Sequence, residues 1–120
     1  MARVTHFEIA MDDPQASIDF YKNVFDWEVF KWEGPMDYWL VGTGDPETPG
    51  IDGALAHREN LMNQPITIII DVDDAAGYMD KVKANGGEQI GELQEIPGQG
   101  ISGYFKDPAG TIVGVMQSFV

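Results

Sequence analysis

Residues 4–13 read Val-Thr-His-Phe-Glu-Ile-Ala-Met-Asp-Asp, and residues 65–74 read Pro-Ile-Thr-Ile-Ile-Ile-Asp-Val-Asp-Asp. The two stretches align without a gap, and each predicts a strand that leads directly into a helix cap. The same alignment pairs His6 with Thr67 and Gly53 with Gly114. A repeat in so short a chain predicts two equivalent units related by a pseudo-two-fold axis.

Both units follow the order strand, helix and three strands. In the first unit we expect a helix that is capped by Asp12 or Asp13 and has Pro14 in its first position. In the second unit we expect a helix that begins after Asp74 and ends at Gly86. The predicted strands cover residues 3–11, 27–31, 37–41, 52–56, 65–72, 88–96, 101–106 and 111–119. The sequence therefore predicts an α+β fold of two βαβββ modules, with a curved mixed sheet that encloses a cleft.

Apolar residues recur at helical spacing in both predicted helices. The first helix is expected to bury Ala16, Phe20, Tyr21, Val24 and Phe25. The second helix is expected to bury Ala75, Tyr78, Met79 and Val82.

Length and composition favour one small globular domain. The 120 residues predict a single domain over 1–120, with module 1 at about 1–60 and module 2 at about 61–120. The formal net charge of −13, with only 7 Lys and Arg, argues against nucleic acids and anionic membranes as partners. Cysteine is absent, which excludes disulfides and thiolate chemistry. No apolar leader precedes the first strand, so we expect a cytoplasmic protein.

Several short motifs resemble the vicinal oxygen chelate superfamily, which includes glyoxalase I, bleomycin resistance proteins and extradiol dioxygenases. Asp-Pro-Gln-Ala-Ser-Ile-Asp-Phe-Tyr-Lys-Asn-Val-Phe-Asp-Trp at 13–27 resembles its helix signature, and Asp-Pro-Ala-Gly-Thr at 107–111 resembles its last turn. Residues 50–55 and 96–100 look like a glyoxalase-like subgroup described as lactoylglutathione lyase-related. The resemblance covers essentially the whole chain and implies the fold more strongly than an activity.

The resemblance also implies where a divalent metal would bind. In glyoxalase-type members, His or Glu residues on the first and last strands of each unit are the ligands, and these positions fall on His6, Gly53, Thr67 and Gly114. Only His6 matches the pattern. Glycine has no ligating side chain, and a threonine hydroxyl is a poor ligand for zinc, nickel or iron. We therefore expect no metal cofactor, and the metal-dependent glyoxalase reaction is not expected either.

A ligand-binding cleft is expected where the paired strands converge. Strand alternation gives Glu8 the same side as His6, and these two residues are the candidates for acid–base catalysis. His57 could join them in a displaced metal or acid–base cluster, although Glu8 could equally pair with Arg58 or Arg3 or meet solvent. Either Tyr38 or Trp39 faces inward, but not both. The expected cleft residues are His6, Glu8, Tyr38, Gly53, Leu55, His57, Thr67, Ile69, Tyr104, Gly114 and Met116.

Three functions remain open from the sequence. The first is a metal-free protein that binds a small molecule in the cleft, as bleomycin resistance proteins do. The second is a lyase or isomerase that acts on a carbonyl substrate through His6 and Glu8, with or without a displaced metal. The third is a non-catalytic interaction subunit. We also expect a homodimer, because exposed sheet edges and an apolar end at Phe119 and Val120 favour pairing.

Overall fold

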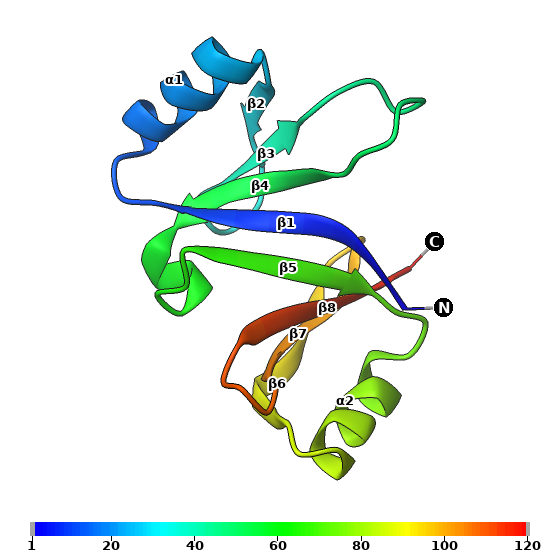
Figure 1. Ribbon diagram of the computed structural model, residues 1–120. Coiled ribbons are helices and arrows are strands. Elements are labelled where there is room, and N and C mark those ends of the chain that lie inside the picture. Colours follow the sequence, from blue (N-terminus) through cyan, green and yellow to red (C-terminus); the bar gives the residue numbers. More distant parts are fainter. Residues whose placement is uncertain (1, 120) are drawn as a thin grey trace. The chain divides into compact units, whose positions relative to one another are not determined.

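A computed structural model describes residues 2–119 and divides them into two compact units (Figure 1). One unit comprises residues 6–67, and the other combines residues 2–5 with residues 68–119. Both boundaries fall inside strands. The single domain expected over residues 1–120 stays a prediction, and Val120 lies outside the described residues.

The unit of residues 6–67 contains a four-stranded mixed sheet and one α-helix. Its elements are β1 (Arg3–Met11), α1 (Pro14–Phe25), β2 (Glu28–Lys31), β3 (Tyr38–Gly42), β4 (Asp52–His57), the short 3-10 helix η1 (Arg58–Leu61) and the start of β5 (Ile66–Asp71). The strand order is β2-β3-β4-β1, with β1 parallel to β4 and the other pairs antiparallel. The predicted order of strand, helix and three strands is confirmed here, whereas η1 had no sequence signal.

The helix α1 begins as the sequence predicts. The carboxylate of Asp13 accepts a hydrogen bond from Ala16 N at 3.3 Å, and Pro14 occupies the first turn. The predicted buried face is wrong in part. Ile18 and Tyr21 pack on the core residues Met11, Val41 and Leu55, whereas Ala16, Phe20, Val24 and Phe25 are exposed. The reason is that Ile18 and Tyr21 define a different stripe of the helix, which rotates the Phe20 and Val24 stripe away from the sheet.

The second unit repeats this organisation. After β5 its elements are α2 (Ala75–Ala84), β6 (Glu88–Ile96), β7 (Gly100–Lys106) and β8 (Ile112–Ser118). The strand order is β5-β8-β7-β6, with β5 parallel to β8 and the other pairs antiparallel. The parallel pair thus joins the first and last strands of each unit, as β1 and β4 do in the other unit. The α+β fold of two βαβββ units is confirmed.

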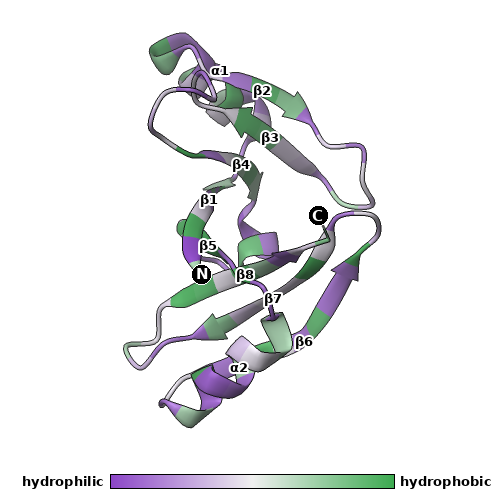
Figure 2. Ribbon diagram, turned by 90° about the vertical axis from the view of Figure 1, so that its right-hand side faces the viewer, coloured by the Kyte–Doolittle hydropathy of each residue, from purple (hydrophilic) through white to green (hydrophobic). Residues whose placement is uncertain are grey.

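The helix α2 covers the core of its unit with the predicted face. Asp74 caps it by accepting from Gly77 N at 3.1 Å. Ala75 and Met79 are buried against Val72 and Val115, and Tyr78 packs beside them. Both helices carry hydrophilic and apolar residues, seen as purple and green ribbon (Figure 2). Because Gly86 has a φ of +91°, it can turn the chain out of α2 at little steric penalty.

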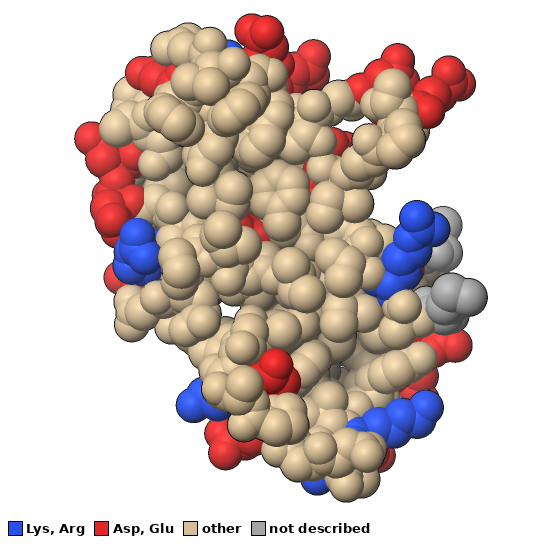
Figure 3. Space-filling model, viewed as in Figure 1, with Lys and Arg blue, Asp and Glu red and all other residues tan. Residues whose placement is uncertain are grey.

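Acidic side chains are more common than basic ones on the visible surface (Figure 3). The chain has 20 Asp and Glu against 7 Lys and Arg, and red atoms outnumber blue ones in the space-filling view (Figure 3). Among residues 2–119, no helix is long and apolar enough to cross a membrane.

Candidate functional site

Three polar side chains of the unit 6–67 form one hydrogen-bonded chain. Tyr38 Oη donates to Glu8 Oε2 at 2.8 Å, and Tyr38 Oη lies 2.9 Å from Nε2 of His6. The rings of His6 and Tyr38 are nearly parallel, with 6.4 Å between their centroids, and Trp32 contacts Tyr38 edge-on. The structure therefore brings together three of the predicted cleft residues.

Strand register explains how these side chains meet. Glu8 lies opposite Ala54, and Tyr38 lies opposite Ala56, so all four share one face of the sheet. Tyr38 belongs to β3, and its side chain reaches across β4 to residues of β1. Alanine at both positions of β4 leaves room for the tyrosine ring to cross. We call the face that carries His6, Glu8 and Tyr38 the polar face.

The polar face holds a buried carboxylate next to a neutralised imidazole. The side chain of Glu8 is 5% exposed, which is rare for a carboxylate and requires hydrogen-bond partners. Burial lowers the pKa of His6 below its ordinary value of 6.5, and the carboxylates of Glu8 and Asp52 oppose part of that change. At neutral pH the imidazole is therefore uncharged.

Asp52 is the residue of this site that the sequence analysis did not single out. It lies opposite His6 in the parallel pair of β1 and β4, and its carboxylate accepts from Thr43 N at 2.9 Å and Thr43 Oγ1 at 3.3 Å. Strand alternation on β4 could have suggested Asp52 in place of Gly53. The register of a parallel pair, however, is set by tertiary packing and leaves no local signal.

Thr67 supplies a further polar group in the same unit. Its side chain is 2% exposed, and its hydroxyl has no hydrogen-bond partner within residues 2–119. The backbone N–H of Ala10 donates to Pro65 O at 2.9 Å, so this segment lies beside β1. Alternation from Ala10 to Glu8 and from Pro65 to Thr67 places the hydroxyl on the polar face.

The other predicted residues of β4 lie on the opposite face. Leu55 is fully buried with Met11 and Val41 under α1. The ring of His57 contacts Trp39 edge-on, and its Nε2 lies 3.6 Å from Asp37 Oδ2. The grouping of His57 with His6 and Glu8 is therefore wrong. The prediction paired His6 with the face of Gly53, whereas His6 lies opposite Asp52, and a shift of one residue moves His57 to the other face of the sheet.

The structure also gives Arg58 another partner and distinguishes Tyr38 from Trp39. Arg58 binds Asp12, with Nε and Oδ1 2.9 Å apart, whereas Glu8 accepts from Tyr38. Trp39 packs on the core below α1, so Tyr38 is the ring that faces His6.

The glycine pair also needs correction. Glu8 lies opposite Ala54, and its counterpart Ile69 lies opposite Gly114, so Gly114 corresponds to Ala54 and not to Gly53. A Cβ on Gly53 would stand 2.5 Å from the Phe7 ring and its carbonyl oxygen. Gly53 therefore accommodates Phe7 on the helix side, and the space expected there for a ligand is filled.

The residues at the family's metal positions do not fit a divalent ion. His6 and Thr67 offer one imidazole and one hydroxyl, and Gly114 offers no donor atom. Asp52, which lies opposite His6 in place of Gly53, accepts hydrogen bonds from Thr43. Among residues 2–119, no three His, Cys, Asp or Glu side chains group closely enough to hold a metal ion.

The second unit gathers the remaining predicted residues on one face of its own sheet. Gly114 lies opposite both Ile69 and Tyr104, and a Cβ there would meet Ile69 Cδ1 at 2.5 Å and the Tyr104 ring at 3.0 Å. Met116 lies two residues further along β8 and shares this face. Ligand binding by these four residues stays a prediction.

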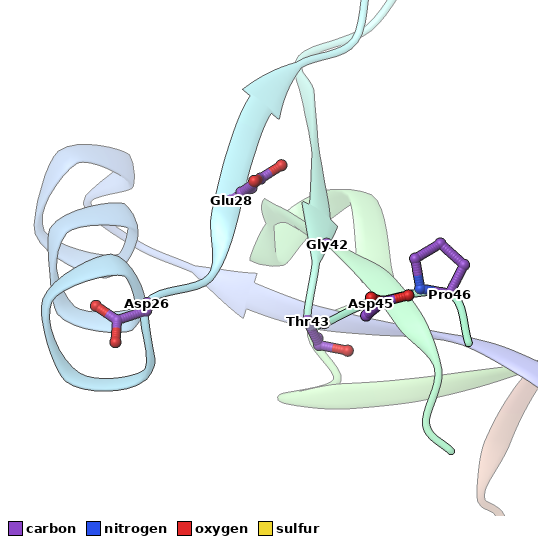
Figure 4. Close-up of a pocket in the computed structure, with 7 residues that line it drawn as sticks. Asp26, Glu28, Gly42, Thr43, Asp45 and Pro46 are labelled. Atoms are coloured by element: carbon purple, nitrogen blue, oxygen red, sulfur yellow. The ribbon is translucent and has the colours of Figure 1, made fainter. Parts of the chain in front are cut away.

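A separate pocket of the first unit is acidic and open. It is lined by Asp26, Glu28, Gly42, Thr43, Gly44, Asp45 and Pro46 (Figure 4). Its carboxylates are exposed, and it contains none of the predicted cleft residues. The hydrogen-bonded chain of the polar face is the better candidate, because Glu8 is the one Asp, Glu, Lys or Arg side chain within residues 2–119 that is buried.

The comparisons with known proteins identify the family. The model of the Glyoxalase/Bleomycin resistance protein/Dioxygenase superfamily matches residues 3–115. The chain belongs to this superfamily. A lactoylglutathione lyase of Neisseria meningitidis serogroup A is 30% identical in an alignment that covers 90% of this chain and 85% of that protein.

Solved structures of the superfamily show the same fold. Methylmalonyl-CoA epimerase of Streptomyces coelicolor, solved in complex with 2-nitronate-propionyl-CoA, has a TM-score of 0.73 at 18% identity and covers 98% of both chains. A superfamily member from Vibrio splendidus has a TM-score of 0.66 at 21% identity, covering 99% of this chain and 100% of its own. At these identities the likeness concerns the fold alone.

Proposed function

We propose that this chain binds a small organic molecule on the polar face. The observation that carries the proposal is the hydrogen-bonded chain of His6, Tyr38 and Glu8, in which the carboxylate is buried. Burying a carboxylate is unfavourable for stability alone, so such a group is more often retained for binding or catalysis. Membership of this superfamily supports a small organic ligand, and the epimerase with a similar fold was solved with such a molecule, 2-nitronate-propionyl-CoA.

Binding is proposed to need no metal. One imidazole and one hydroxyl at the family positions cannot hold a divalent ion tightly. We therefore expect the purified chain to show no glyoxalase I activity with the glutathione hemithioacetal of methylglyoxal, with or without added nickel or zinc. Metal-dependent turnover that His6→Ala abolishes would contradict the metal-free proposal.

Backbone amide NMR tests where small molecules bind. Uniformly ¹⁵N-labelled protein is titrated with acetophenone and with benzyl alcohol, two aromatic probes that differ in their polar group. We expect the largest shifts at His6, Glu8 and Tyr38, and weaker binding by Tyr38→Phe. Tyr78→Phe is the matched control, because this tyrosine lies on α2 and its ring faces Lys81. Shifts confined to other elements would refute the polar face as the binding site.

A second candidate is proton transfer on a carbonyl compound. Glu8 and His6 both contact the hydroxyl of Tyr38. A proton accepted by one of them can therefore be compensated by a proton released from the other through this hydroxyl. The test is exchange of the α-hydrogens of hydroxyacetone in D₂O, followed by proton NMR. Catalysed exchange that Glu8→Gln and His6→Gln each abolish would support an enzyme. Exchange at the uncatalysed rate would refute proton transfer, and ligand binding would remain as the proposed function.

The proposal also includes a homodimer in the cytoplasm. Exposed apolar side chains of α1 support the dimer, since Phe20, Val24 and Phe25 are each more than half exposed. The absence of cysteine agrees with a reducing compartment. A non-catalytic interaction subunit is less favoured, because it has no need of a buried carboxylate.

A further inference from the structure

The hydrogen-bonded chain fixes which nitrogen of His6 carries the proton. A carboxylate can only accept, so the single hydrogen of Tyr38 Oη is donated to Glu8 Oε2 at 2.8 Å. The contact between Tyr38 Oη and His6 Nε2, at 2.9 Å, must then use the hydrogen of Nε2. A neutral imidazole protonated at Nε2 has a lone pair at Nδ1.

This lone pair has no protein partner in the described part of the chain. The contacts of the His6 side chain are the Nε2 bond to Tyr38 and the parallel stacking of the two rings. The His6 side chain is partly buried, and Nδ1 is not among the fully buried atoms without a partner, so a bound molecule can reach it. A half-buried acceptor of this kind gains from a donor that a bound molecule brings.

The charges around His6 select the kind of donor. The carboxylates of Glu8 and Asp52 both act on His6 and make this region negative. Two cations of the same unit are already neutralised, since Lys31 pairs with Asp37 and Arg58 pairs with Asp12. An anionic group would be repelled here, whereas an uncharged or cationic donor would not.

Thr67 provides an independent sign that a ligand completes the polar face. Its hydroxyl is buried on the same face and has no partner within residues 2–119. A hydroxyl both donates and accepts, so a ligand group that donates to one atom and accepts from another would satisfy it.

We propose that Nδ1 of His6 accepts a hydrogen bond from a hydroxyl or amine of the bound molecule, so that the polar face selects uncharged or cationic ligands that carry such a donor. This inference rests on the proposed function and adds the chemical class of the ligand. Tyr38 acts as a positioning residue, because it sets the tautomer of His6.

Imidazole ¹⁵N NMR tests the tautomer in the free protein at pH 7.5. We expect His6 to show a protonated Nε2 and an unprotonated Nδ1. Tyr38→Phe should abolish this preference, and Tyr78→Phe should leave it unchanged. A His57→Gln variant assigns the signals, since the chain has two histidines. Protonation of Nδ1 in the free wild-type protein would overturn the inference and leave the proposed binding site standing.

Four matched probes test the ligand class: benzyl alcohol, benzylamine, benzyl methyl ether and benzoate. The alcohol and the amine should shift the Nδ1 signal and bind about two- to twelve-fold more tightly than the ether, as expected for one net hydrogen bond. Benzoate should bind most weakly. Equal binding of the ether or benzoate at the polar face overturns the donor rule alone. Failure of all four probes to move signals of His6, Glu8 and Tyr38 refutes the binding site itself.

Discussion

Tyr38 links the two ionisable residues of the polar face through one hydroxyl group. Replacing it by phenylalanine removes a hydrogen bond to a buried carboxylate. We expect Tyr38→Phe to lower the free energy of unfolding by about 1.5–3 kcal/mol, which is the range for a hydrogen bond to a charged group. Urea denaturation at pH 7.5 measures the change. Tyr78→Phe should stay within about 0.5 kcal/mol of wild type, and equal effects of the two variants would contradict the structural role of Tyr38.

His6 makes stability depend on pH in a defined direction. Burial lowers its folded-state pKa below 6.5, so the unfolded state binds more protons between the two pKa values. The contribution of a neutral His6 is therefore fully present above about pH 6.5 and is lost as the pH falls toward the folded-state pKa. Between pH 7.5 and pH 5.5, we expect the free energy of unfolding of the wild type to fall more than that of His6→Gln. A pH-independent difference would show that His6 does not titrate abnormally.

Packing across β1 and β4 depends on Gly53, which has no side chain at a point of close approach. A Cβ at Gly53 would lie 2.5 Å from the Phe7 carbonyl oxygen, which is backbone and cannot move aside easily. We expect Gly53→Ala to destabilise the protein by about 1–3 kcal/mol through overpacking. Gly42→Ala on β3 is the control, because its nearest atom would be Glu28 Cβ at 3.9 Å. Thermal unfolding of the two variants compares them, and a similar melting temperature would contradict the close approach.

The helices and strands could be predicted from the sequence, but the register between strands could not. Caps at Asp13 and Asp74 and alternating apolar runs predicted the helices and strands, since these signals are local. Which residues of β4 share a face with His6 depends on the register of a parallel pair. Along the chain, β1 and β4 are separated by α1, β2 and β3. The repeat suggested Gly53, whereas the structure gives Asp52.

The candidate site was therefore predicted in part. His6, Glu8 and Tyr38 were chosen from residue type and strand parity, and the structure brings them together. His57 was misplaced because parity along β4 was counted from the wrong residue. The exposed face of α1 could not be foreseen either, since Phe20 and Val24 have the same helical spacing as a buried stripe.

At the scale of the whole molecule, the exposed apolar side chains predict association. Phe20, Val24 and Phe25 on α1, together with Phe119, are between 48% and 55% exposed. Burial of such groups stabilises a dimer by removing apolar surface from water. We expect light scattering at micromolar concentration to give twice the 13.2 kDa mass of one chain. A monomeric mass that persists at tenfold higher concentration would contradict the homodimer.

The division of the chain within β1 and β5 also has a consequence for folding during synthesis. The unit of residues 6–67 is continuous, so all of its residues exist once the ribosome has passed position 67. The other unit combines residues 2–5, which are made first, with residues 68–119. At ordinary translation rates, about 3 to 10 s separate the two events. During that interval β1 can pair with β4 from His6 to Met11. Residues 2–5 have no partners from their own unit until residues 68–119 have been made.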